Sequence, residues 1–333
     1  MSVVTRVSRL SRLPEDGSPR RSRVWSRAVP TELKRLAVLV AIIAVFSYMN
    51  PGFLRVDSMF AILQALAFAG IVAVGQTLLI IAGEFDLSVG SNACLTSIVA
   101  ALLMTQGGLD PTFAMVIGVA VGAAVGLANA LLVLRARIPS FIATIAMLGI
   151  ARGLATWLCG ARPVFDLPLS QYTNADSVVP FSVVALIVLI ALGQLVVTRT
   201  NFGRTICATG GNPEAARIAG VKTLRIKTVL FVTSGILAGL SGMFTIIHFG
   251  SSTITTGTGW ELSAVAAVVV GGTSLFGGGG TLIGTLIGLS ILQTIASGLV
   301  VVHVDPWWQT VVVGVVMLGS VSIDSVRRRA VPA

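Results

Sequence analysis

The chain has 333 residues, of which 55% are hydrophobic and only 11% are charged. Soluble domains carry about 25% charged residues, so this composition excludes an ordinary soluble domain and indicates a protein that lies in a lipid bilayer. The formal net charge of +10 is common in proteins that bind nucleic acid. Here, however, the basic residues lie between apolar segments, and this placement argues against a nucleic-acid-binding protein.

The apolar segments predict an all-α, polytopic membrane protein with about ten transmembrane helices, since a spanning helix needs about 20 apolar residues. The predicted spans are 36–54, 59–82, 88–106, 112–134, 140–159, 179–198, 227–248, 260–276, 280–301 and 305–323. This divides the chain into a basic tail over 1–35, a transmembrane domain over 36–323 and a short tail over 324–333.

Lys and Arg are distributed unevenly between the two sides of these spans. With the N-terminus in the cytoplasm, 20 of the 23 basic residues fall on the cytoplasmic side. Only Arg55 and Arg162 lie in external loops, and Arg152 lies within a span. Cytoplasmic loops carry an excess of basic residues, so both termini are predicted to be cytoplasmic. The tail over 1–35 is interpreted as a disordered orienting tail, and contact with anionic lipid is the alternative.

The polar connection over 199–227 contains the signals of a short surface helix. Asn212 suits the N-cap of a helix over 213–219, which begins with a proline at its first position. Glu214 lies in the first turn, where the helix dipole favours negative charge. Gly220 suits the left-handed conformation that ends a helix. Such a helix is suited to docking on another protein, and an ordinary solvated loop is the alternative.

Two similar segments, GEFDLSVG over 83–90 and GWELSA over 259–264, each place an acid, a leucine and a serine at the start of an apolar segment. In the ten-span arrangement, Asp86 lies near the inner membrane face and Glu261 near the outer face. Spans two to five and seven to ten would then be inverted repeats, and in transporters built this way the solute site lies at the repeat interface.

The glycine-rich segment GGTSLFGGGG over 271–280 predicts either a tight turn or unwound backbone that lines a cavity. No Lys-Ser or Lys-Thr pair follows the glycines, which argues against a phosphate-binding loop. The chain has only three lysines, so a nucleotide site of its own is not expected.

No set of nucleophile, base and acid is visible, and an enzyme is not expected. The three cysteines, 94, 159 and 207, are scattered, so neither a disulfide framework nor a metal site is predicted. His248 and His303 are interpreted as isolated structural residues near span ends.

Polar residues within or beside the spans are the candidates for a solute path. The candidates are Gln76, Asp86, Ser88, Gly90, Asn92, Asn129, Arg152, Glu261, Ser263, Gly271 and Gly272. Hydrogen bonding between helices is the alternative for the amides, and helix capping is the alternative for the two acids. Arg152 requires a partner or a path to the membrane interface. Few charges lie in the spans, which predicts a neutral, hydroxyl-rich solute.

Three blocks of the chain resemble the sugar-type permeases of ATP-binding cassette (ABC) importers, the family of the ribose, xylose and galactose systems. They are GQTLLIIAGEFDLSVGSNACL (75–95), FGRTICATGGNPEAARIAG (202–220) and GTGWELSAVAAVVVGGTSLFGGGGTLIGTLIG (257–288). Together they lie in order on one frame from about residue 36 to 323.

The resemblance implies a separate ATP-binding subunit that hydrolyses ATP, with no cofactor held by this chain. It implies a second permease copy or paralogue, an extracytoplasmic sugar-binding protein, and a location in the bacterial inner membrane. The middle block would couple to the ATPase through Gly203, Arg204, Gly210, Gly211, Asn212, Pro213, Glu214, Ala215, Ala216, Arg217 and Gly220. The other two blocks would shape the translocation path.

Two alternatives remain open at this point. Branched-chain amino-acid ABC permeases share the architecture, although the FDLSVG and ELSAVAAVVVGG blocks favour sugars. An ion-coupled secondary transporter would need an acid or histidine within the membrane. Family members often have Gly-Gly-Ile-Asp where this chain has Gly-Glu-Phe-Asp over 83–86, which leaves the exact sugar open.

Overall fold

The computed structural model describes residues 31–178, 180–305 and scattered positions between 307 and 319. Helices dominate these residues, which confirms the predicted all-α class. The helices are α1 (Thr31–Met49), η1 (Pro51–Leu54), α2 (Val56–Ile81), α3 (Val89–Thr105), α4 (Pro111–Leu134), α5 (Ser140–Leu158), α6 (Ser170–Val178), α7 (Phe181–Arg199), α8 (Asn201–Gly211), α9 (Pro213–Ile218), α10 (Thr223–Phe249), α11 (Trp260–Val270) and α12 (Leu282–Val301).

Six described helices, α2, α4, α5, α7, α10 and α12, are long and apolar enough to cross a membrane. Two further apolar helices, α3 and α11, are shorter. The predicted span over 260–276 is wrong at its C-terminal end, because α11 stops at Val270 and the glycine-rich segment continues as turns. The predicted span over 36–54 also ends early, since the helix breaks before Pro51. The tail over 1–30, most of the span over 305–323, and the tail over 324–333 lie outside the described residues.

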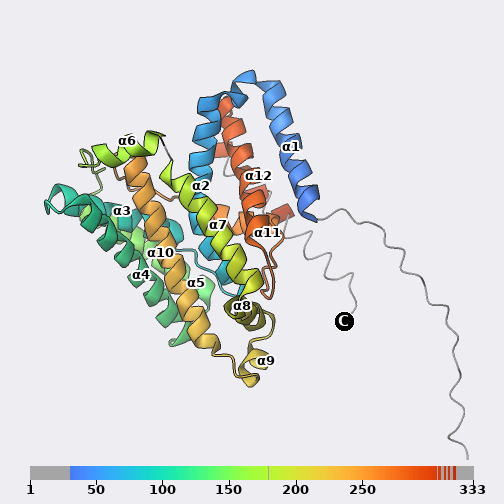
Figure 1. Cartoon of the computed structure of the whole chain (residues 1–333). Coiled ribbons are helices and arrows are strands. Elements are labelled where there is room, and N and C mark those ends of the chain that lie inside the picture. The colour runs from blue at the N-terminus through green and yellow to red at the C-terminus, as the bar shows by residue number, and fades with distance from the viewer. Residues whose placement is uncertain are drawn as a thin grey trace, which may run out of the picture.

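Helices α2 and α10 form the centre of the bundle, and α10 runs from α6 at one end to α9 at the other (Figure 1). We call these the α6 end and the α9 end. Helix α4 lies along α10 because both present glycines at the contact. A Cβ atom on Gly122 would lie 2.5 Å from the Gly235 carbonyl oxygen, and one on Gly126 would lie 2.3 Å from the Phe231 carbonyl oxygen. Small residues bring membrane helices this close.

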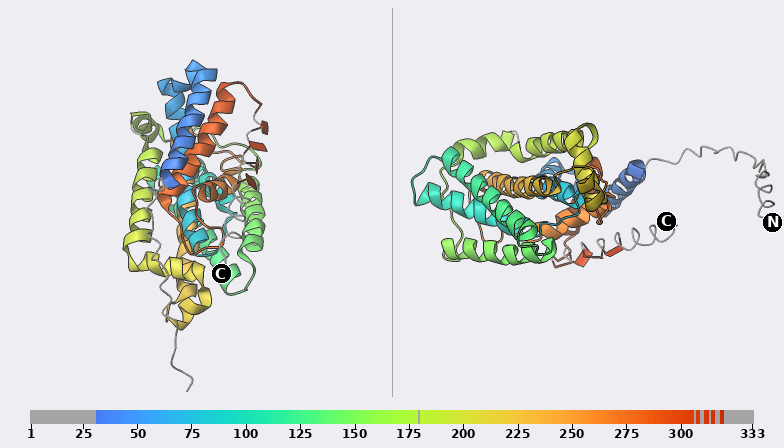
Figure 2. Two further views of the ribbon diagram at one scale, coloured as in Figure 1. Left: turned by 90° about the vertical axis from the view of Figure 1, so that its right-hand side faces the viewer. Right: turned by 90° about the horizontal axis from the view of Figure 1, so that it is seen from below.

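Helices α5 and α7 flank the centre from opposite sides, and α1 lies at one edge beside α12 (Figure 2). Large apolar side chains on these outer helices point away from the bundle, among them Trp157 on α5 and Ile187 on α7. In water such surfaces would be costly, whereas a bilayer solvates them.

The two short helices begin inside the bundle. After α2 ends, residues 83–88 run back from the α9 end before α3 starts, and after α10 ends, residues 250–259 run back from the α6 end before α11 starts. The two starts meet, because a Cβ atom on Gly90 would lie 2.1 Å from the Gly257 carbonyl oxygen. In addition, α3 packs on α10 and α11 packs on α2. An inverted repeat would produce this exchange of partners, and the repeat itself stays a prediction.

Candidate functional site

Asp86 is the centre of a buried polar cluster at the start of α3. The side chain is fully buried, and its Oδ1 accepts hydrogen bonds from the Ser88 backbone N–H at 3.0 Å and the Ser88 hydroxyl at 2.6 Å. The Asn129 amide donates to Oδ1 at 3.3 Å from α4, and the Ser234 hydroxyl donates to Oδ2 at 3.1 Å from α10. Asp86 is not the N-cap of α3, because Ser88 occupies that position. Its carboxylate instead joins the start of α3 to α4 and α10.

Glu84, the acid that departs from the family pattern, has a local partner. Its Oε1 lies 2.6 Å from the Lys227 ammonium of α10, and both side chains are largely buried. The pair ties the segment after α2 to the first turns of α10. Neither residue lines the cavity described below.

Arg152 of α5 satisfies its guanidinium on the 250–259 segment. One of its nitrogens, Nη1, donates to the carbonyl oxygens of Ile254 at 2.6 Å and Thr256 at 2.8 Å. The predicted need for a partner is therefore met by backbone carbonyls. Ser252, in the same segment, donates to Ser97 of α3 at 2.9 Å. These contacts hold the segment within the bundle.

A cavity of 560 Å³ lies beside this segment, between α2, α10, α11 and α12. Phe68, Phe249 and Trp260 give it aromatic surfaces, and the 250–259 segment contributes threonines and Gly257. Its volume lies within the range of about 300–1,000 Å³ typical of small-molecule sites. Of the predicted path residues, Ser263 lines this cavity.

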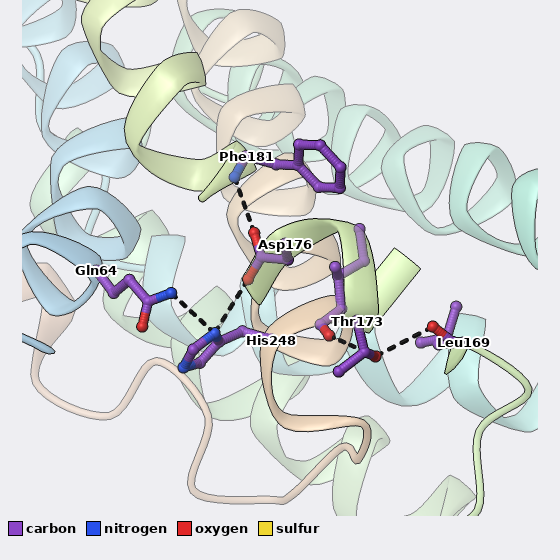
Figure 3. Close-up of polar contacts among 7 residues, drawn as sticks. Gln64, Leu169, Thr173, Asp176, Phe181 and His248 are labelled. Carbon is purple, nitrogen blue, oxygen red and sulfur yellow. Dashed lines mark hydrogen bonds and ion pairs between the residues drawn. The ribbon is translucent and has the colours of Figure 1, made fainter. Parts of the chain in front are cut away.

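His248 joins three helices at the α6 end beside the cavity (Figure 3). Its Nδ1 lies 3.1 Å from the Gln64 amide of α2 and 3.1 Å from Oδ2 of Asp176 on α6. One nitrogen cannot serve both contacts at once, so the tautomer selects which is made. Asp176 Oδ1 also accepts from the Phe181 backbone N–H at 2.8 Å. The interpretation of His248 as isolated is wrong. Its partner Asp176 lies on α6, a helix that the sequence analysis did not predict.

The predicted surface helix is present as α9, which ends one residue early. The Asn212 side chain accepts from the Ala215 backbone N–H at 2.9 Å, and Gly220 has a φ of 84°, so both predicted caps are present. Glu214 pairs with Arg217 at 2.7 Å, and this hydrogen bond and charge lower the pKa of Glu214. Ile218 is 79% exposed, so α9 presents an apolar side chain on an accessible surface.

The 201–211 part of the predicted loop is in fact a second helix, α8. Thr200 caps it by accepting from the Gly203 backbone N–H at 3.1 Å, and Arg204 bonds to Asn201. The sequence analysis missed this helix because it contains three glycines, and glycine has a low helix propensity. Gly203 serves packing, since a Cβ atom there would lie 2.2 Å from the Val196 carbonyl oxygen.

Gly210, near the end of α8, lies against the end of α2. A Cβ atom there would be 1.8 Å from the Ile81 carbonyl oxygen and 2.8 Å from the Gly278 nitrogen. The Gly278 N–H donates to the same Ile81 carbonyl at 2.9 Å. The structure thus joins α8, the end of α2 and the glycine-rich segment at one carbonyl group. This segment is a compact turn rather than a lining of the cavity.

The other predicted path residues occupy different environments. Asn92 donates to the Gly122 carbonyl at 3.2 Å, and Glu261 Oε1 accepts from the Gly259 N–H at 3.3 Å at the start of α11. Gly271 packs against Gly284 of α12, and Gly272, with φ of 82°, lies beside Arg35. Within the described residues, Gln76 is buried with both amide atoms unpartnered.

The sequence interpretation missed most of the cavity. Phe68, Phe249 and Trp260 are ordinary apolar residues in a pattern of spans, and only the fold brings them together. The available signal was the hydroxyl-rich segment SSTITTGT over 251–258, which lies between two apolar helices.

Comparisons with known proteins identify relatives along nearly the whole chain. A protein-family model described as branched-chain amino acid transport system / permease component matches residues 58–321. The ribose import permease protein RbsC of Escherichia coli is 36% identical over 313 residues, which cover 91% of this chain and 96% of the relative.

Two further relatives are similar over almost the same length. The ribose import permease protein RbsC of Bacillus subtilis is 33% identical over 307 residues, covering 91% of this chain and 95% of the relative. The fructose import permease protein FrcC of Rhizobium meliloti is 31% identical over 307 residues, covering 89% of this chain and 85% of the relative. No solved structure matches the chain. The sugar names of these relatives favour the sugar branch over the amino-acid alternative, and the chain belongs to the sugar-type permeases of ABC importers.

Proposed function

We propose that this chain is the membrane subunit of an importer that moves a monosaccharide or related polyol into the bacterial cytoplasm, driven by a separate ATPase. The observation that carries the proposal is α9, a capped and exposed helix that is joined through α8 to the membrane core. A transporter that used an ion gradient would have no need of such a helix.

Coupling in this proposal follows a continuous path of contacts. An ATPase that binds α9 would push or pull α8, and Gly210 would pass that movement to the end of α2 and to Gly278. Both elements lead directly to the short helices α3 and α11, whose starts meet at Gly90 and Gly257. Movement there would open or close the bundle, as alternating access requires.

The proposal places the α9 end in the cytoplasm and the α6 end outside, in agreement with the distribution of Lys and Arg. ATPase subunits would then bind at the α9 end. A sugar-binding protein would deliver solute at the α6 end, and a second permease copy or paralogue would complete the transporter. The tails over 1–35 and 324–333 would be cytoplasmic.

The energy source can be tested in cells or vesicles that carry the complete transporter. Labelled monosaccharide uptake is expected to survive a protonophore while ATP is maintained, and to stop when ATP is depleted with the ion gradient intact. The opposite pattern would contradict an ABC importer and favour an ion-coupled secondary transporter.

A further inference from the structure

We propose that the 560 Å³ cavity is a solute-binding site, in which the Trp260 ring contacts the apolar face of a neutral sugar and the surrounding hydroxyl and amide groups bind the sugar hydroxyls. This proposal rests on the proposed import function and adds to it a place on the translocation path. The cavity is large enough for a monosaccharide together with ordered water, as its volume indicates.

The aromatic surface is arranged as a platform. The rings of Phe68 and Trp260 lie nearly parallel, with an interplanar angle of 19° and centroids 6.4 Å apart. The ring centroid of Phe249 lies 6.2 Å from that of Phe68. A sugar ring has an apolar face of C–H groups, and a rigid aromatic plane covers such a face while its hydroxyl groups stay at the edge. Trp260 also begins α11, so its position is fixed by the backbone of that helix.

Polar groups line the same cavity from two sides. The 250–259 segment supplies Thr253, Thr255 and Thr256, and Gln293 of α12 supplies an amide. Hydroxyl groups both donate and accept hydrogen bonds, and an amide does the same, which matches the mixed donors and acceptors of a sugar. The Thr253 and Thr255 hydroxyls share one hydrogen bond at 2.9 Å, in which either can be the donor, and a bound sugar hydroxyl can replace one partner of this bond.

The charge of the lining narrows the ligand class. Among the described residues that line the cavity, none is Asp, Glu, Lys, Arg or His. A zwitterionic amino acid would bring a carboxylate and an ammonium into this space without a charged partner, which is costly. A neutral polyhydroxyl compound brings no such cost, so the lining fits sugars and polyols.

The cavity reaches the contact between Gly90 and Gly257. Gly257 lines the cavity, and its carbonyl oxygen lies against Gly90 at the start of α3. A solute in the cavity would therefore lie beside this contact, which in the proposal closes the path toward the α9 end. Separation of α3 from α11 would let the solute move on toward the α9 end. The site therefore lies on the α6 side of this contact.

The test uses the complete transporter in vesicles, with uptake of labelled D-ribose, D-fructose and a panel of other monosaccharides and polyols measured together with ATP hydrolysis. Trp260→Ala and, independently, Gln293→Leu are compared with the wild type. Trp157→Ala is the matched control, because that tryptophan is 75% exposed on α5, away from the cavity. Gln293 donates only one described side-chain hydrogen bond, to Ser297, so its replacement keeps the fold even if Trp260→Ala does not.

Both cavity variants are expected to lower the sugar moved per ATP by roughly tenfold, with binding-protein-stimulated ATP hydrolysis retained and the control unchanged. Trp260→Phe should recover part of the loss, since it restores an aromatic surface. Wild-type import with an unchanged sugar-to-ATP ratio in both cavity variants would overturn the site and leave the import function standing. A wild-type transporter that imports none of the panel would contradict the import function, and the site with it.

Discussion

Replacing Gly210 with alanine is expected to reduce ATP-driven uptake by at least roughly tenfold, because the added methyl group occupies space that the Ile81 carbonyl now fills. Overpacking of this kind costs about 1–3 kcal/mol or more. Alanine would otherwise favour helix α8 by about 1 kcal/mol relative to glycine, so the intrinsic propensity and the steric effect act in opposite directions. A loss of uptake therefore reports on the contact between α8 and α2.

Gly211→Ala is the matched control for this variant. The two glycines are neighbours in the last turn of α8, but a Cβ atom on Gly211 would meet only Gly278 Cα at an ordinary 3.7 Å. Uptake should stay near the wild-type rate in Gly211→Ala, with both variants present in the membrane at equal levels. Equal uptake by the two variants would contradict a role of the Gly210 contact in transmission.

Asp86→Ala is expected to destabilise the protein by about 3 kcal/mol or more, because it leaves several buried donors without an acceptor. The affected groups are the Ser88 N–H and hydroxyl, the Asn129 amide and the Ser234 hydroxyl. The midpoint of thermal unfolding in detergent should fall, and the yield of monodisperse protein should fall with it.

Two comparisons separate this effect from a general loss of charge. Asp86→Asn keeps one acceptor oxygen, so its unfolding midpoint should lie between those of Asp86→Ala and the wild type. Asp57→Ala removes an acid that is 90% exposed at the α6 end and should change the midpoint little. An Asp86→Ala protein as stable as the wild type would show that the cluster does not hold α3, α4 and α10 together.

The fold was predictable from sequence to the extent that apolar length determines it. The six long helices coincide with predicted spans, because about 20 consecutive apolar residues have few alternatives to crossing a bilayer. Apolar length alone placed the end of α11 too late, because the predicted span over 260–276 runs into the glycine-rich segment over 271–280, for which the sequence also predicted a turn or unwound backbone. Only the turn backbone, with Gly272 and Gly277 at positive φ, ends that helix.

The surface helix was predictable because its signals are local. Asn212 accepts a hydrogen bond from the Ala215 N–H, and Pro213 and Gly220 act through their own backbone conformations. Each lies where the capping rules place it. The roles of Asp86 and Arg152 depend on partners far along the chain, at Ser234 and at Ile254. The sequence identified Arg152 as needing a partner and Asp86 as a path candidate or helix cap, and it could not say which distant residues each would contact.

The pairing of the Phe68 and Trp260 rings in the cavity was also not predictable from the sequence. Phe68 and Trp260 come from α2 and α11, and they stack because α11 begins inside the bundle rather than at its surface. Tryptophan at the start of an apolar segment predicts a residue at the membrane interface. The re-entrant course of residues 250–259 is what moves it inward.

The most direct measurement of the central claim is co-purification of the tagged chain from its native membrane, with mass spectrometry of the proteins that accompany it. The wild type is expected to bring an ATP-binding subunit, and Glu214→Lys is expected to lose it while the chain stays in the membrane. Asp57→Lys is the matched control, because that acid also lies in a first helical turn beside an arginine, at the opposite end of the bundle. It should keep the ATPase. Purification of the wild type alone, with uptake in liposomes that follows an ion gradient, would contradict an ATP-driven permease.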